Sequence, residues 1–84
     1  MMSDEELKRI YWHSRRGMLE LDLVLMPFAQ QNLATLDAAD QRRYVDLLAQ
    51  EDTDIFRWLL RAESPPDGDL KRIVALILDA HGRG

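Results

Sequence analysis

The residues best suited to binding chemistry lie together in residues 15–22, which read Arg-Arg-Gly-Met-Leu-Glu-Leu-Asp. This octapeptide combines two guanidinium groups, a glycine and two carboxylates. Charged side chains are almost never fully buried unless they are paired, so most of these groups are expected at the surface. A glycine inside a helix costs about 1 kcal/mol relative to alanine, so Gly17 is better explained by a turn or by close approach of another backbone. The octapeptide therefore predicts a recognition surface where two helices meet.

The alternative for the same residues is an ordinary solvated face of one helix. Arg16 and Glu20 are four residues apart, the spacing of an intrahelical ion pair that contributes about 0.2–0.5 kcal/mol. However, Gly17 lies between them and would interrupt such a helix, and arginine before glutamate is the less favourable order relative to the helix dipole. From the residues alone, the recognition surface and the solvated face remain about equally supported.

Catalytic and metal-binding patterns are not found elsewhere in the chain. His13 and His81 lack the spacing of a metal-binding pair, and the four glycines are scattered rather than gathered in a phosphate-binding loop. The sequence has no cysteine, which excludes disulfides, iron–sulfur ligation and thiolate zinc sites. We therefore expect no catalytic residues, no metal, no tightly bound cofactor and no enzymatic activity of its own.

Length and charge narrow the class of protein. The 84 residues are enough for one domain, residues 1–84, in which residues 1–5 and 82–84 are expected to fray. The net charge of −4 disfavours nucleic-acid binding. No apolar run approaches the roughly 20 residues of a membrane-spanning helix, and the acidic start resembles neither a secretory nor a mitochondrial leader. These features predict a protein of the bacterial cytoplasm without membrane insertion.

Apolar residues recur at spacings of three and four, which predicts an all-α fold: a compact bundle of about five short antiparallel helices. Ser3 should cap the first helix, which ends near residue 14. The second should span 18–33, with either a kink or a restart at Pro27. Asp37 should cap the third helix. The last should run over 69–81 and end at Gly82.

The fourth helix carries two further candidate residues. Either Asp52 or Thr53 is expected to cap it, so a role as helix cap is favoured for Asp52 over a role as ligand. Its inner stripe should contain Ile55, Phe56, Leu59 and Leu60. Trp58 lies slightly off that stripe and should reach the surface, where tryptophan is frequent among interface hot spots. A position in the core and a position in a partner contact are equally supported for Trp58. Met18, beside Gly17, is a further contact candidate.

Two motifs carry a family resemblance. The first is Arg-Arg-Gly-Met-x-Glu-x-Asp at 15–22, followed by Leu-Met-Pro-Phe at 25–28. The second is Leu-Leu-x-x-Glu-Asp-x-Asp-x-Phe-x-Trp-Leu at 47–59. Together they resemble the succinate dehydrogenase FAD-assembly factors, the SdhE family, some members of which are labelled CptB-type antitoxins. The resemblance covers roughly residues 7–78.

This resemblance implies a function and a site. It implies a chaperone-like factor that binds the flavoprotein subunit of succinate dehydrogenase, and by extension that of fumarate reductase, and promotes covalent flavinylation by FAD that the partner holds. The family's Arg-Gly-x-x-Glu motif implies that the partner is bound by Arg16, Gly17 and Glu20. Their neighbours Arg15, Met18 and Asp22 would support them, and the second motif adds Asp52 and Trp58. An antitoxin-like or regulatory interaction module, using the same surface, is the alternative.

Overall fold

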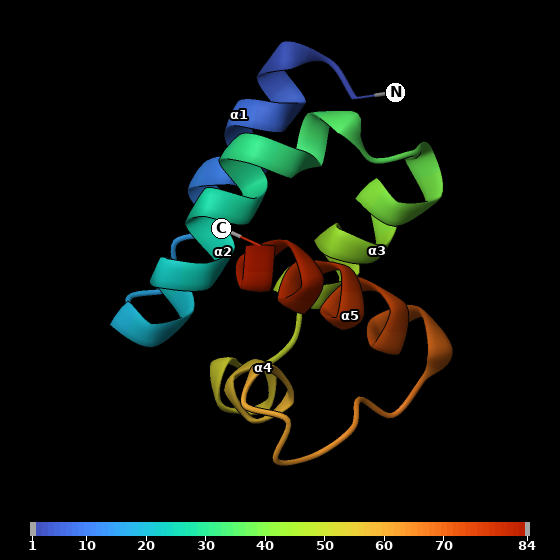
Figure 1. The fold of residues 1–84 in the computed structure, drawn as a ribbon. Helices are drawn as coiled ribbons and strands as arrows, with labels where there is room; N and C mark the ends of the chain where they lie inside the picture. The colour runs from blue at the N-terminus through green and yellow to red at the C-terminus, as the bar shows by residue number, and fades with distance from the viewer. Residues whose placement is uncertain (1, 84) are drawn as a thin grey trace.

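The computed structural model describes residues 2–83, and within them the chain forms five α-helices, one 3-10 turn and no strand. The all-α prediction is confirmed (Figure 1). In chain order the elements are α1 (Asp4–His13), α2 (Leu19–Asn32), the 3-10 turn η1 (Leu33–Thr35), α3 (Ala38–Leu48), α4 (Asp52–Leu59) and α5 (Gly68–Arg83).

Helices α2 and α5 are central to the packing. Helix α5 packs against α2, α3 and α4, whereas α1 packs along α2, and α4 closes the end of the molecule opposite the N-terminus (Figure 1). One continuous core joins these helices. Its buried apolar residues are Leu21, Leu25, Phe28, Ala29, Leu33, Tyr44, Leu47, Leu48, Ile55, Trp58, Leu70, Ile73, Val74 and Ile77. No helix in the described chain is both long enough and apolar enough to span a bilayer.

Helix starts follow the expected capping chemistry. The Ser3 hydroxyl accepts from the backbone N–H of Glu6, and the Glu6 carboxylate accepts in return from the Ser3 backbone, which completes a capping box. Asp37 accepts from the N–H of Asp40 at the start of α3. Asp67 does the same for Leu70, so α5 begins at residue 68 rather than 69.

Helix α2 continues through Pro27 without a break, so the predicted restart is wrong. The proline ring removes one backbone donor, which leaves the carbonyl of Leu23 without its helical partner. Both Leu23 and Pro27 are exposed, so water can take the place of the missing N–H. The solvent-facing position explains why the helix tolerates the proline.

Three expectations for the last two helices are wrong. The N-cap of α4 is Glu51, so neither Asp52 nor Thr53 caps it. Of the predicted inner stripe, Ile55 is buried and Phe56 and Leu59 pack partly against the core, as expected. Leu60, however, lies exposed beyond the helix end, and Trp58 takes the second buried position, three residues after Ile55 on the same face. Gly82 does not end α5, which continues to residue 83. A glycine stops a helix only where the backbone adopts positive φ, and Gly82 does not.

A buried hydrogen-bond cluster joins the end of α1 to α2 and α3. Tyr44 donates its hydroxyl proton to the Ser14 hydroxyl at 2.7 Å, and the Tyr44 oxygen also lies 3.3 Å from the carbonyl of Leu25. Ser14 in turn donates to the carbonyl of Ile10 at 2.8 Å. Since α1 has no fully buried side chain within its own span, this cluster is a polar anchor for its C-terminal end.

A second polar cluster joins α3 to α5. Asp40 is buried, and its carboxylate accepts two bonds from Arg72, at 2.8 and 2.9 Å, and one from Arg43 at 2.8 Å. The hydrogen bonds from Arg72, followed by that from Arg43, hold the pKa of Asp40 below its usual range despite the opposing effect of burial. The buried carboxylate of Asp40 is thus kept charged, and its hydrogen-bonding capacity is used by the two arginines.

The Tyr44→Phe substitution should remove the polar anchor while keeping the ring. We expect the free energy of unfolding to fall by about 1–2 kcal/mol, because the buried Ser14 hydroxyl loses its hydrogen-bond partner. Burial also raises the pKa of Tyr44 from 10.0 to about 12. The unfolded chain therefore releases this proton first, and wild-type stability should decline as pH rises from about 10 to about 12. Denaturant titrations across that range should show a shallower decline for the variant.

Arg61 is a non-glycine residue with φ of +61°, at the end of α4. The Arg61 N–H donates to the Trp58 carbonyl, and the Ala62 N–H donates to the Arg57 carbonyl, which together form a Schellman motif. Arg61→Gly should therefore raise the free energy of unfolding by about 0.5–1 kcal/mol, since glycine adopts this conformation without strain. Arg57→Gly, within the helix, is the control and should lower it by about 1 kcal/mol. A destabilised Arg61→Gly variant in urea denaturation would contradict this explanation.

Candidate partner-binding site

The turn between α1 and α2 is centred on Gly17. Its φ is +81°, a conformation that side-chain-bearing residues rarely adopt, and it is exposed. A Cβ placed on Gly17 would meet no heavy atom within 4 Å, so the turn requires glycine for its backbone torsion rather than for internal space. The predicted helix break is confirmed, and the backbone there is open to another molecule.

The Arg16 side chain points into the protein. The expectation that its guanidinium faces outward to bind a partner is therefore wrong. Its Nε donates to Asp52 Oδ1 at 2.7 Å, Nη1 donates to the Leu48 carbonyl at 2.7 Å, and Nη2 donates to the Gln50 carbonyl at 3.2 Å. The side chain is only 14% exposed. We call this arrangement, Arg16 with Asp52 and the carbonyls of Leu48 and Gln50, the Arg16 clamp.

The clamp lies where the backbone favours a positive charge. Leu48 ends α3, so carbonyls at and just beyond this end lack helical donors and carry partial negative charge. Asp52 opens α4, where the helix dipole favours a carboxylate. One planar guanidinium bonds both the carbonyls at the end of α3 and the Asp52 carboxylate at the start of α4. A lysine ammonium could not reproduce this geometry.

Asp22 holds the turn from its other side. Its Oδ1 accepts from the backbone N–H of Arg16 at 2.7 Å, across the Gly17 turn. Arg16 is therefore fixed through its main chain by Asp22 and through its side chain by the clamp. The alternative of an Arg16–Glu20 ion pair does not occur, because the guanidinium is directed towards Asp52.

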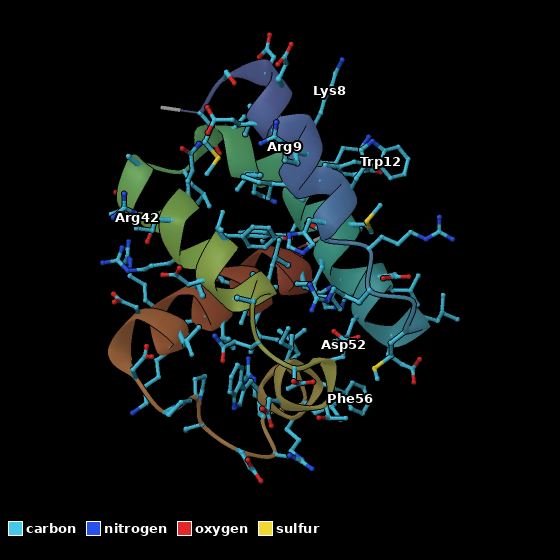
Figure 2. All side chains as sticks on the ribbon, turned by 180° about the vertical axis from the view of Figure 1, so that it is seen from behind. Lys8, Arg9, Trp12, Arg42, Asp52 and Phe56 are labelled. Carbon is cyan, nitrogen blue, oxygen red and sulfur yellow. The ribbon has the colours of Figure 1, made fainter. Side chains whose placement is uncertain are left out.

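Within the octapeptide, the side chains of Met18 and Leu21 pack inward, whereas three charged or glycine positions face outward. Arg15, Gly17 and Glu20 are exposed, and within residues 2–83 neither the Arg15 nor the Glu20 side chain makes a hydrogen bond or ion pair. Two large apolar residues that the sequence pattern did not single out accompany them. Leu19 is 66% exposed and Trp12 is 63% exposed, and Figure 2 shows Trp12 pointing away from the bundle on α1. We call these five residues the turn surface.

The remaining candidates lie inside or beside the core. Met18 is partly buried against the core. Trp58 is only 6% exposed, so of the two positions left open for it, core and surface contact, the core is confirmed. Trp58 also lines an open groove of about 500 Å³ formed by α4, the following loop and α5. Asp52 is half-buried in the clamp (Figure 2).

Metal binding finds no support in the geometry of the described chain. His13 and His81 are exposed. No group of three or more histidine, aspartate or glutamate side chains within residues 2–83 converges in a way that could hold an ion. What the arrangement offers is an exposed surface that combines charged and apolar side chains.

Arg16→Lys tests the clamp. A lysine ammonium cannot reproduce the fork that reaches Asp52 and two carbonyls, so we expect the free energy of unfolding to fall by about 1–3 kcal/mol in urea titrations. Arg15→Lys, one residue earlier and exposed, is the matched control and should change it by less than about 0.5 kcal/mol. Equal stability of the two variants would show that the clamp contributes nothing.

Comparison with known proteins gives one consistent family. Residues 8–81 match the family model described as the flavinator of succinate dehydrogenase. A Pseudomonas aeruginosa protein named FAD assembly factor SdhE is 57% identical over 79 residues, covering 93% of this chain and 94% of that protein. Proteins of the same name from Pseudomonas putida and Photobacterium profundum are 48% and 44% identical, covering 94% and 77% of this chain and of each relative. The chain belongs to the succinate dehydrogenase flavinator family, as its two motifs predicted.

Proposed function

We propose that this chain is an FAD assembly factor that binds the flavoprotein subunit of succinate dehydrogenase, and by extension that of fumarate reductase, and promotes covalent attachment of FAD to it. The family match over residues 8–81 carries the proposal, since it covers nearly the whole domain and the relatives share one name. The turn surface supports it as the place of contact.

Each part of the turn surface has a role suited to protein binding. Gly17 lets a partner backbone approach closely, because no side chain shields it. Glu20 pairs with a cation of the partner, and Arg15 takes the anchoring role expected for Arg16, whose guanidinium is already engaged. Trp12 and Leu19 supply exposed apolar area beside these charges, a composition typical of binding hot spots.

The task of this chain is positional. FAD held by the flavoprotein would supply the reacting ring carbon, and a histidine of the flavoprotein would supply the nucleophile. By docking on the flavoprotein, the helical domain holds that partner in the geometry that brings the two reacting groups together. Orientation alone can lower a barrier by several kcal/mol. The chain therefore needs no catalytic residue of its own and no tight site for FAD.

A genetic experiment tests the function directly. Cell extracts with and without this gene are separated on a denaturing gel and read for covalent flavin fluorescence. The proposal expects the band of the dehydrogenase flavoprotein to be bright with the gene and dim without it. An equally bright band in both extracts would refute it.

Gly17→Arg should abolish binding to the flavoprotein and covalent flavinylation. The bulky side chain would stand on the turn surface, and the positive φ would cost about 1–2 kcal/mol of stability without a clash inside the protein. Circular dichroism should show that the bundle remains helical, and pull-down with the flavoprotein measures binding.

Gly68→Arg is the matched control. It places the same side chain at another exposed glycine with open space around it, at the start of α5 and outside the turn surface. It should leave binding and flavinylation near the wild-type level. Normal flavinylation by Gly17→Arg would show that the turn is not the contact.

A further inference from the structure

We propose that Asp52 is a positioning residue for partner binding: acting through Arg16, it holds the Gly17 turn in the conformation that the flavoprotein recognises. This inference rests on the proposed function and concerns the same surface. It assigns a role inside the protein to a carboxylate that lies 36 residues away in sequence from its arginine.

Residue 16 controls the orientation of the turn. It directly precedes Gly17 and is fixed twice, by its main-chain bond to Asp22 and by its side-chain bonds to the clamp. On the other side of the turn, the Met18 carbonyl accepts from Leu21 and Asp22 as α2 begins. The turn is thus held at both ends, and glycine, the residue with the greatest backbone freedom, is the only position left between them.

Asp52 is the part of the clamp that belongs to a side chain. The other acceptors of the Arg16 guanidinium are backbone carbonyls. Those of Leu48 and Gln50 lie at and just beyond the end of α3, and that of His13 lies at the end of α1. The Asp52 side chain is 32% exposed and makes no capping bond for α4, whose N-cap is Glu51. A substitution at residue 52 therefore alters the clamp without replacing any residue of the octapeptide, the core or the helix cap.

A role in positioning follows from the energetics of the bond. A partly exposed ion pair contributes little to global stability, so stability alone does not account for a carboxylate aimed at a guanidinium that already has carbonyl partners. Fixing a flexible turn before a partner arrives, in contrast, lowers the entropic cost of binding. The chief effect of Asp52 is therefore expected in affinity and local order rather than in the unfolding midpoint.

The test compares Asp52→Asn and Asp52→Ala with the wild-type domain. Two measurements are made: affinity for the purified flavoprotein subunit, and NMR hydrogen exchange of the Arg16 Nε–H and of the Arg16 and Gly17 amides. We expect affinity to fall by about threefold to tenfold, more for alanine than for asparagine, because asparagine keeps an acceptor oxygen. The same N–H groups should exchange faster, while the core amides of Ile73 and Ile77 remain unchanged.

Asp54→Asn is the control, since Asp54 is in the same first turn of α4 but pairs locally with Arg57 at 3.2 Å. It should change neither measurement. Weaker binding by Asp52 variants without faster exchange at residues 16 and 17 would mean that Asp52 touches the partner directly, which overturns the inference. Faster exchange with unchanged affinity would overturn it too. If the wild-type domain itself fails to bind the flavoprotein, the proposed function falls, and the inference with it.

Discussion

A single guanidinium group, that of Arg16, fixes the turn between α1 and α2 in this small domain. It lies between the carbonyl end of α3 and the amino end of α4, and it reaches both from the loop that joins α1 to α2. Three chain segments that are distant in sequence therefore meet at one cation. Because Arg16 is fixed by bonds within the protein, the neighbouring Gly17 can be exposed and still have a defined backbone position. The turn surface depends on this arrangement.

The charged octapeptide thus divides into two sets with different tasks. Arg16 and Asp22 bind within the chain and hold the turn, whereas Arg15, Gly17 and Glu20 face outward. Residue type alone could not make this division, since both sets contain an arginine and a carboxylate. What decides it is the position of Asp52 and of the α3 carbonyls, which only the folded structure brings near. Spacing along the sequence correctly predicted an exposed turn between two helices, but not which arginine faces outward there.

Much of the fold could be predicted because it follows from local chemistry. The Ser3 and Asp37 caps and the break at Gly17 depend on neighbours within a few residues. The errors and the open alternatives arise where tertiary contacts decide. Trp58 is buried because α5 covers that side of α4, and Asp52 pairs with a distant arginine instead of capping its own helix. The exposure of Trp12 and Leu19 could not be read from helices that carry apolar residues on more than one face.

The contrasting positions of the two tryptophans have a spectroscopic consequence. Trp58 is enclosed by the core, while Trp12 stands in solvent beside the turn, with the Tyr11 ring edge-on at 5.4 Å. Indole emission shifts with the polarity of its surroundings, so each indole reports a different event. The emission of Trp58 should follow loss of the native state, and, under the proposed function, that of Trp12 should follow binding of the partner. The protein thus carries an intrinsic optical probe for each process, with no label to attach.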